Sequence, residues 1–187
     1  MKTKLIFRLG ITWFILLMVS CVNGQKNENN TEENKDSIPE YTIDFPETGF
    51  KVEKTAERIP PENILVTNWI LQGKNENGPF MYFVATNKFP NQLKELIKQE
   101  PKSLYAAFQS MLTSSAAKLG GTDFEFKEIE YENFKGMESI CKVFDGDGII
   151  KSRVYKVNND LFMISAGGKN ISIESVDKFL NSFKLKQ

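Results

Sequence analysis

The period of hydrophobic and polar positions predicts the first elements of the chain. Residues 41–45 alternate between apolar and polar side chains before Pro46, which is typical of a short strand. Two longer apolar runs, 64–71 and 80–86, flank a polar segment that begins and ends with glycine, so they predict a hairpin. Both runs are apolar at consecutive positions. We therefore expect this part of the sheet to be covered on both faces.

The period then changes to that of a helix. A stripe on one helical face follows Pro101 and stops before Gly120: Leu104, Phe108, Met111, Leu112, Ser115 and Leu119. We expect a shorter helix at residues 93–98 before it. A final stripe predicts a closing helix with Ser172 as its N-cap: Val176, Phe179, Leu180 and Phe183.

Between these helices the period returns to two. Phe124 and Phe126 are followed by Ile129 and Tyr131, and the change of register between the pairs predicts a β-bulge. Turn-forming residues separate three further strands, at 137–144, 149–157 and 161–166. Residues 40–187 are therefore expected to form one α+β domain with a mainly antiparallel sheet.

Four segments of this domain resemble the PsbP-like domains of bacteria: YTIDFP at 41–46, NFKGME at 133–138, KSRVYKVNNDLF at 151–162 and KFLNSFKL at 178–185. The resemblance implies an α/β/α sandwich that is shared with the photosystem II extrinsic protein, a Ran-binding eukaryotic regulator and several bacterial envelope lipoproteins. Because those proteins are mostly binding or assembly proteins, it also implies a binding role. It supports the architecture more strongly than the activity.

The N-terminus has the pattern of an export signal. Three basic residues precede an apolar stretch at 9–19, which is shorter than the ~20 residues of a membrane-spanning helix. The sequence Met-Val-Ser-Cys at 18–21 resembles a bacterial lipobox, which predicts a signal peptide at 1–20 and lipidation of Cys21. The alternative is cleavage near Gly24, which would give a secreted or periplasmic protein beginning at Gln25.

The segment 21–39 is expected to be a disordered polar tether, because it is rich in asparagine and charge and almost lacks apolar residues. A tether beside a lipidated cysteine would hold the domain of residues 40–187 near a membrane. We therefore expect a protein that is exported to the cell envelope and anchored to a membrane by lipid.

The composition excludes several classes of chemistry. The chain has no histidine, which removes serine–histidine and cysteine–histidine catalysis and histidine–zinc sites. The 24 basic residues equal the 24 acidic ones, and residues 40–187 contain 19 basic and 20 acidic residues. This balance gives no electrostatic sign of a nucleic-acid partner, which would need a basic face. We predict no cofactor and no metal site.

Several local motifs have simpler structural explanations. Cys141 lies in an apolar strand, which favours a buried hydrophobic role over a reactive thiol, and no disulfide with Cys21 is predicted. Ser115 and Lys118 match an S-x-x-K pattern but lack its partner motifs. The DGDG sequence at 145–148 fits a tight turn better than a calcium loop.

Three further features of the sequence also have structural explanations. Gly-Gly-Lys at 167–169 is expected to end a strand rather than bind phosphate. Trp69 is expected in the core rather than in a sugar platform. Five acidic residues are expected on a solvated strand face, with a two-carboxylate glycosidase site as the alternative: Asp123, Glu125, Glu128, Glu130 and Glu132.

The leading hypothesis is a non-enzymatic envelope lipoprotein whose domain binds a protein partner or assists assembly. One alternative is a small-ligand carrier, and another is a carboxylate-based envelope hydrolase. The sequence determines neither the partner nor the oligomeric state.

Overall fold

The predicted hairpin forms, and it is longer than the apolar runs alone. In the computed structural model, which describes residues 40–186, β3 (Ile64–Asn75) pairs antiparallel with β4 (Gly78–Lys88). The side-chain oxygen of Asn75 accepts hydrogen bonds from the backbone N–H groups of Asn77 and Gly78. Gly78 has a positive φ of 128°, which glycine adopts without steric cost. The turn is therefore fixed by two local features of the sequence.

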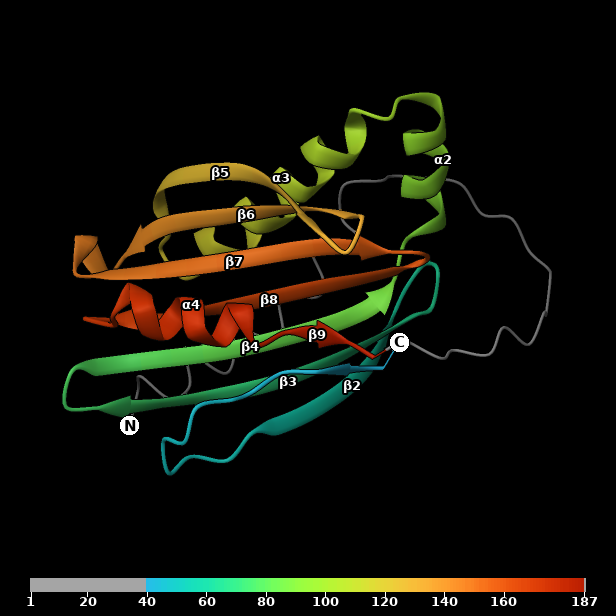
Figure 1. Cartoon of the computed structure of the whole chain (residues 1–187). Coiled ribbons are helices and arrows are strands. Elements are labelled where there is room, and N and C mark those ends of the chain that lie inside the picture. Colours follow the sequence, from blue (N-terminus) through green and yellow to red (C-terminus); the bar gives the residue numbers. More distant parts are fainter. Residues whose placement is uncertain (1–39, 187) are drawn as a thin grey trace.

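All seven strands of the main sheet are antiparallel to their neighbours, in the order β2-β3-β4-β8-β7-β6-β5 (Figure 1). The remaining strands of this sheet are β2 (Glu53–Ile59), β5 (Thr122–Tyr131), β6 (Phe134–Val143), β7 (Gly148–Val157) and β8 (Asp160–Lys169). The prediction of an α+β fold with a mainly antiparallel sheet is confirmed.

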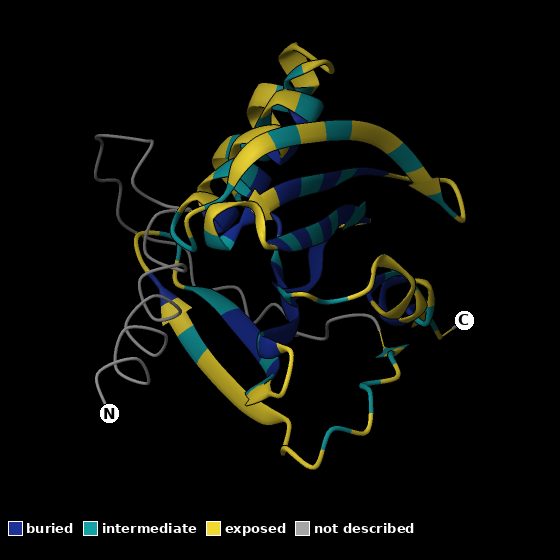
Figure 2. Cartoon of the chain, turned by 90° about the vertical axis from the view of Figure 1, so that its left-hand side faces the viewer, coloured by how far each residue is buried: buried dark blue, intermediate teal, exposed yellow. Residues whose placement is uncertain are grey.

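Helices cover both faces of this sheet (Figure 2). The helices are α2 (Asn91–Gln99), α3 (Ser103–Ala117) and α4 (Ile173–Asn181). Leu104, Phe108 and Leu112 of α3 pack on one face, against the side chains of a cluster that includes Met163. Val176, Phe179 and Leu180 of α4 pack on the opposite face, in a cluster that includes Ile164. Because β4 and β8 contribute to both clusters, the centre of the sheet is buried on both sides, as expected.

A second, two-stranded sheet closes the domain. β1 (Tyr41–Thr42) pairs with β9 (Lys184–Leu185), so the beginning and end of the domain lie side by side. The Tyr41 ring contacts the rings of Trp69, Phe162 and Phe183 at centroid distances of 5.4, 5.6 and 5.8 Å. These aromatic contacts attach the small sheet to the α4 side of the large one.

The prediction of a bulge between Phe126 and Ile129 is wrong. From Glu125 to Tyr131 the pairing of β5 with β6 is continuous, and the irregularity lies between Thr122 and Glu125. The change of apolar period has another cause: Phe126 packs on the α3 side, whereas Ile129 packs on the α4 side. A strand at the edge of a sheet can bury side chains on both faces without a register slip.

β2 was not predicted, because five of its seven residues are exposed and its sequence, EKTAERI, is mostly polar. The 310 turn η1 (Phe144–Gly146) connects β6 to β7 where a turn was expected. Within residues 40–186, no helix has the length and apolar character to cross a membrane.

Candidate functional site

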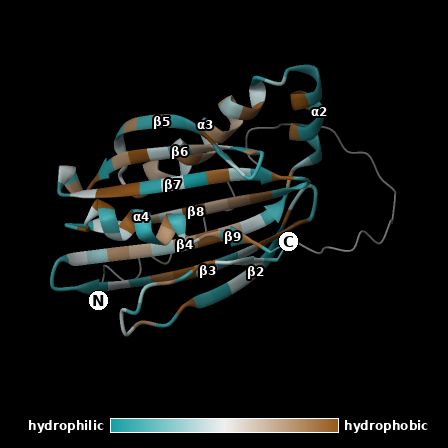
Figure 3. Cartoon of the chain, in the orientation of Figure 1, coloured by the Kyte–Doolittle hydropathy of each residue, from teal (hydrophilic) through white to brown (hydrophobic). Residues whose placement is uncertain are grey.

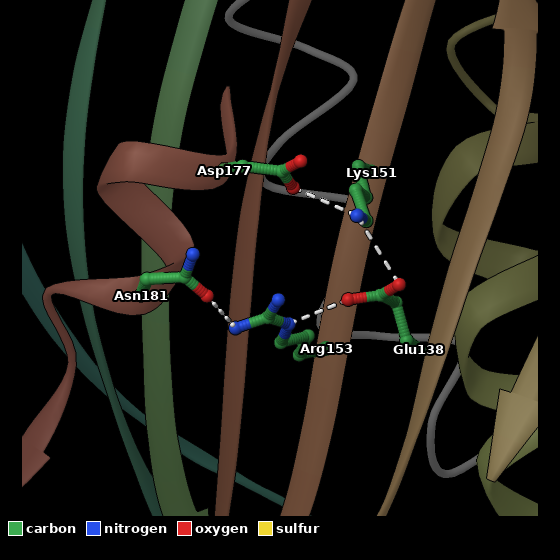
Figure 4. Close-up of polar contacts among 5 residues, drawn as sticks. All are labelled: Glu138, Lys151, Arg153, Asp177 and Asn181. Carbon is green, nitrogen blue, oxygen red and sulfur yellow. Dashed lines mark hydrogen bonds and ion pairs between the residues drawn. The ribbon is translucent and has the colours of Figure 1, made fainter. Parts of the chain in front are cut away.

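Polar side chains from two strands and one helix meet on the α4 side of the sheet (Figure 4). Lys151 and Arg153 are two residues apart on β7, so both point to the same face. Glu138 of β6 is directly opposite Arg153 in the strand register. Asp177 and Asn181 are one turn apart on α4 and therefore share a side of that helix. We refer to these five residues as the α4 network.

Each side chain of the α4 network has a close partner within it. Lys151 Nζ lies 2.7 Å from Asp177 Oδ1 and 3.2 Å from Glu138 Oε1. Arg153 Nε donates to Glu138 Oε2 at 2.6 Å, and its Nη1 donates to Asn181 Oδ1 at 2.9 Å. The network thus links β6, β7 and α4 through one continuous chain of contacts.

The α4 network is partly shielded from water and balanced in charge. The side chains of Lys151, Arg153 and Glu138 are 14%, 17% and 17% exposed, whereas Asp177 is 37% exposed. Desolvation lowers the pKa of Lys151, but hydrogen bonds and charge from Asp177 and Glu138 outweigh it, so the net pKa is raised. Two cations face two carboxylates, and the ammonium of Lys151 is held in its charged form.

This geometry favours a structural role for the α4 network. Both carboxylate oxygens of Glu138 are occupied by cationic groups, so neither is open to a substrate. The contacts of Asp177 and Asn181 fix the helix over β7 with defined rotation. We therefore interpret the network as the attachment of α4 to the sheet.

A second shielded carboxylate is also paired. Asp160 of β8 has a side chain that is 5% exposed, and Lys88 of β4 lies opposite it in the strand register. Lys88 Nζ is 3.0 Å from Asp160 Oδ1. Removal of Lys88 would leave a shielded carboxylate without this cationic neighbour, which is costly even where the pair itself adds little stability.

Beyond α4, one end of the sheet is less covered than its centre. We call this surface the β5–β6 shelf and define it by the α4-side residues of these strands: Glu125, Lys127, Ile129, Tyr131, Phe134 and Ile140. Ile129, Tyr131, Phe134 and Ile140 are half-buried, whereas Glu125 and Lys127 are exposed. Helix α4 packs over β7 and β8, which leaves the shelf beside it. The shelf therefore presents half-buried apolar side chains next to exposed charged ones.

Hydrophilic residues alternate with hydrophobic ones along β5 (Figure 3), and four of its ten residues are acidic. The five acidic residues expected on one solvated strand face are all exposed, but they do not share a face: Glu125 lies on the α4 side, whereas Glu128 and Glu130 lie on the α3 side. Asp123 pairs with Lys142 at 3.1 Å. In the described part of the chain, Glu125, Glu128 and Glu130 form no ion pair within 4.0 Å.

Two of the reactive-residue candidates are buried. Cys141 is 3% exposed, and burial raises the pKa of its thiol despite an opposing backbone hydrogen bond from Ile150. Ser115 is 6% exposed, and its hydroxyl donates to the Leu112 carbonyl within the same helix. Burial lowers the pKa of Lys118. Both cysteine and serine therefore fit the structural explanations.

The other candidates occupy loops, strand ends and the aromatic core. Asp147, in the turn after β6, pairs with Lys169 at 3.2 Å. Gly167 and Gly168 lie inside β8, where an added Cβ would meet the backbone of neighbouring strands at 2.3 and 2.6 Å. Trp69 is half-buried beneath Tyr41, and Lys54 Nζ lies 5.3 Å from the centre of its ring.

Residues 40–186 contain no group of three or more cysteine, aspartate or glutamate side chains placed to hold a metal ion. Cys21, the predicted lipidation site, lies outside the described residues, as do the predicted signal peptide and tether. No family model matches the chain, and no curated protein matches it either.

Sequence analysis missed the α4 network. The alternation of Lys151, Arg153 and Tyr155 was a signal that these residues share one strand face. Their partners were not identifiable, because Asp177 and Asn181 lie more than twenty residues away on a helix whose docking position was unknown. The position of β5 at the edge of the sheet was not identifiable from the sequence either, because it depends on the order of the strands.

Proposed function

We propose that this protein is a non-enzymatic cell-envelope lipoprotein. It is anchored through a lipid on Cys21, and its folded domain binds a protein partner. The observation that carries the proposal is the β5–β6 end of the sheet, where half-buried apolar side chains adjoin exposed charges. Mixed surfaces of this kind suit reversible protein contacts, which combine an apolar centre with a polar rim.

The domain is proposed to be PsbP-like. Residues from the segments that carry the resemblance converge on the α4 side of the sheet. Tyr41 contacts Phe162 and Phe183, and Tyr155 stacks on Phe183 at 6.0 Å with an interplanar angle of 4°. These contacts connect β1, the β7–β8 hairpin and the C-terminal segment. Helices on both sheet faces are a further feature that supports this architecture.

The length of the segment between Cys21 and Glu40 limits how far the domain can lie from the membrane. From Cys21 to Glu40 there are 19 peptide links, which span at most about 65 Å when fully extended. The described chain begins at Glu40, whose carboxylate lies 3.0 Å from Lys186 Nζ. A membrane-anchored form would therefore keep Glu40, where the domain begins, within that distance of the bilayer.

The anchoring part of the proposal is tested by metabolic labelling with a palmitate analogue. We expect the wild-type protein and a Cys141→Ala control to be labelled and to fractionate with membranes. A Cys21→Ala variant should lose the label, because it lacks the acceptor thiol. Labelling that survives this change would contradict the anchor, and a mature N-terminus at Gln25 would support the secreted alternative.

The binding part is tested by photo-crosslinking in intact host cells. A photoreactive amino acid at Lys127, on the shelf, should yield a discrete cross-linked protein, because this exposed residue lies next to the half-buried Ile129. The same amino acid at Glu53 of β2, at the opposite end of the sheet, is the control. Equal products at both positions, or none at Lys127, would argue against the shelf as a partner surface.

A further inference from the structure

The free edge of β5 has backbone groups available for another strand. The main sheet ends at β5, and no described residue pairs with its outer side. Tyr131 and Phe134 flank a two-residue turn, so they form a hydrogen-bonded pair. Because such pairs alternate along an antiparallel ladder, the N–H and C=O groups of Phe126, Glu128 and Glu130 point outward.

The side chains of these same three residues lie together on the α3 side. Glu128 and Glu130 are exposed, and Phe126 is half-buried and stacked on Phe124 at 6.0 Å with an interplanar angle of 5°. Burial and, after it, the neighbouring charge of Glu128 raise the pKa of Tyr105 on α3. The edge thus offers two carboxylates at alternate positions, followed by an aromatic surface.

Charge distinguishes this edge from the other end of the sheet. β5 contains four acidic residues and Lys127, whereas β2 contains two acidic and two basic residues. Two copies of β5 paired edge to edge would bring carboxylates together, which is destabilising. A basic strand would instead meet opposite charges. The acidic edge therefore disfavours a second copy of this chain and favours a basic partner.

We propose that the outer edge of β5 binds an extended basic segment of a partner protein as an eighth strand. Two lysine or arginine residues, two positions apart, would face Glu130 and Glu128, and an apolar residue two positions further would cover Phe126. In antiparallel pairing the motif is basic-x-basic-x-apolar. This inference rests on the proposed binding function and specifies the partner's chemistry.

The competing explanation is that these charges only protect an exposed edge from aggregation. The two explanations differ in what a matching peptide does. If the charges are only protective, a basic peptide would bind weakly and without regard to spacing. If the edge is a docking site, both the spacing and the backbone contacts matter.

The test is binding of labelled synthetic peptides to the full chain at physiological salt. The probe has the core Lys-Thr-Lys-Thr-Phe, and its control, Lys-Lys-Thr-Thr-Phe, has the same composition with adjacent lysines. We expect the probe to bind at least about tenfold more tightly than the control. The Glu128→Gln/Glu130→Gln double variant should weaken probe binding about tenfold, whereas the matched Glu53→Gln/Glu57→Gln variant on β2 should not.

Amide hydrogen exchange supplies a readout that charge alone would not change. Bound probe should slow exchange at the amides of Phe126, Glu128 and Glu130, because these would become hydrogen-bonded to the added strand. Circular dichroism of each variant establishes that it is folded. Equal binding of both peptides, no binding, or binding without this protection would overturn the inference, as would dimerisation of the wild-type chain through β5.

These outcomes separate the two proposals. Cross-linking at Lys127 in cells with no specific peptide binding would reject the added strand and leave the binding function in place. Absence of any cross-linked partner would count against the binding function itself, whatever the peptides do.

Discussion

The Cys141 sulfur belongs to a small apolar cluster with Ala116, Val143 and Ile150. Its neighbours supply no cationic or histidine side chain that would stabilise a thiolate, and burial raises the pKa of the thiol. The residue therefore packs as a small hydrophobic side chain. At this scale, the type of residue and the type of strand were sufficient to predict the role.

Buried tyrosines predict a loss of stability at alkaline pH. Burial raises the pKa values of Tyr41, Tyr82 and Tyr155 above the ordinary value of 10.0. In the unfolded chain these phenols ionise near that pH, while the folded state keeps them protonated. The folded state then binds more protons, so the free energy of unfolding falls as pH rises above the unfolded pKa. Lys151 acts in the same direction, because its folded pKa is also raised.

Urea unfolding between about pH 8 and about pH 11 measures this effect, which is at most about 1.4 kcal/mol per pH unit for each group. We expect little change below about pH 9 and a steady decrease above about pH 10. A Tyr155→Phe variant should show a shallower decrease, since it lacks one of these phenols. Stability that stays constant up to about pH 11 would contradict the assignment.

At the scale of elements, the α4 network predicts a hierarchy of destabilisation. Glu138→Gln leaves two shielded cations without their shared carboxylate, so it should cost about 1–3 kcal/mol. Asp177→Asn should cost less than about 1 kcal/mol, because its side chain is more exposed and Lys151 keeps Glu138. Urea unfolding of the variants provides the comparison.

A matched control for this hierarchy is the exposed pair of Glu95 and Lys98 on α2, at 2.6 Å. Their side chains are 63% and 71% exposed, so Glu95→Gln should leave the free energy of unfolding nearly unchanged. If Glu138→Gln were no more destabilising than Glu95→Gln, the α4 network would not attach the helix.

The whole molecule is closed by the pairing of β1 with β9. Deletion of residues 184–187 removes that pairing and the hydrogen bond from the Lys186 N–H to the Glu40 carbonyl. We expect a loss of about 1–3 kcal/mol in the free energy of unfolding and faster proteolysis near residues 40–45. Lys186→Gln, which removes only an exposed ion pair, should do neither. Equal proteolysis of the deletion variant and the wild type would refute this role.

The sequence by itself determined most elements and which of their faces are buried. Continuous apolar runs predicted β3 and β4, and helical patterns predicted α3 and α4. The side chain of Ser172 accepts a hydrogen bond from the Ser175 N–H at the start of α4, as its N-cap assignment requires. These features depend on residues close together in the chain, so local periodicity contains them. The short turns between consecutive strands also determine that those strands pair antiparallel, because a parallel pair needs a longer crossover connection.

Only the tertiary structure decided which elements meet. β2 is a strand because it pairs with the edge of β3. Its own sequence is mostly polar and has no apolar face that would predict a strand. Phe126 and Ile129 lie three residues apart in a continuous strand and so face opposite sides of β5, and both can be apolar because covering groups lie on both sides there. The α4 network and the free acidic edge follow from strand order and helix docking. Such long-range contacts form because together they remove the most apolar surface from water, and no local pattern of residues specifies that arrangement.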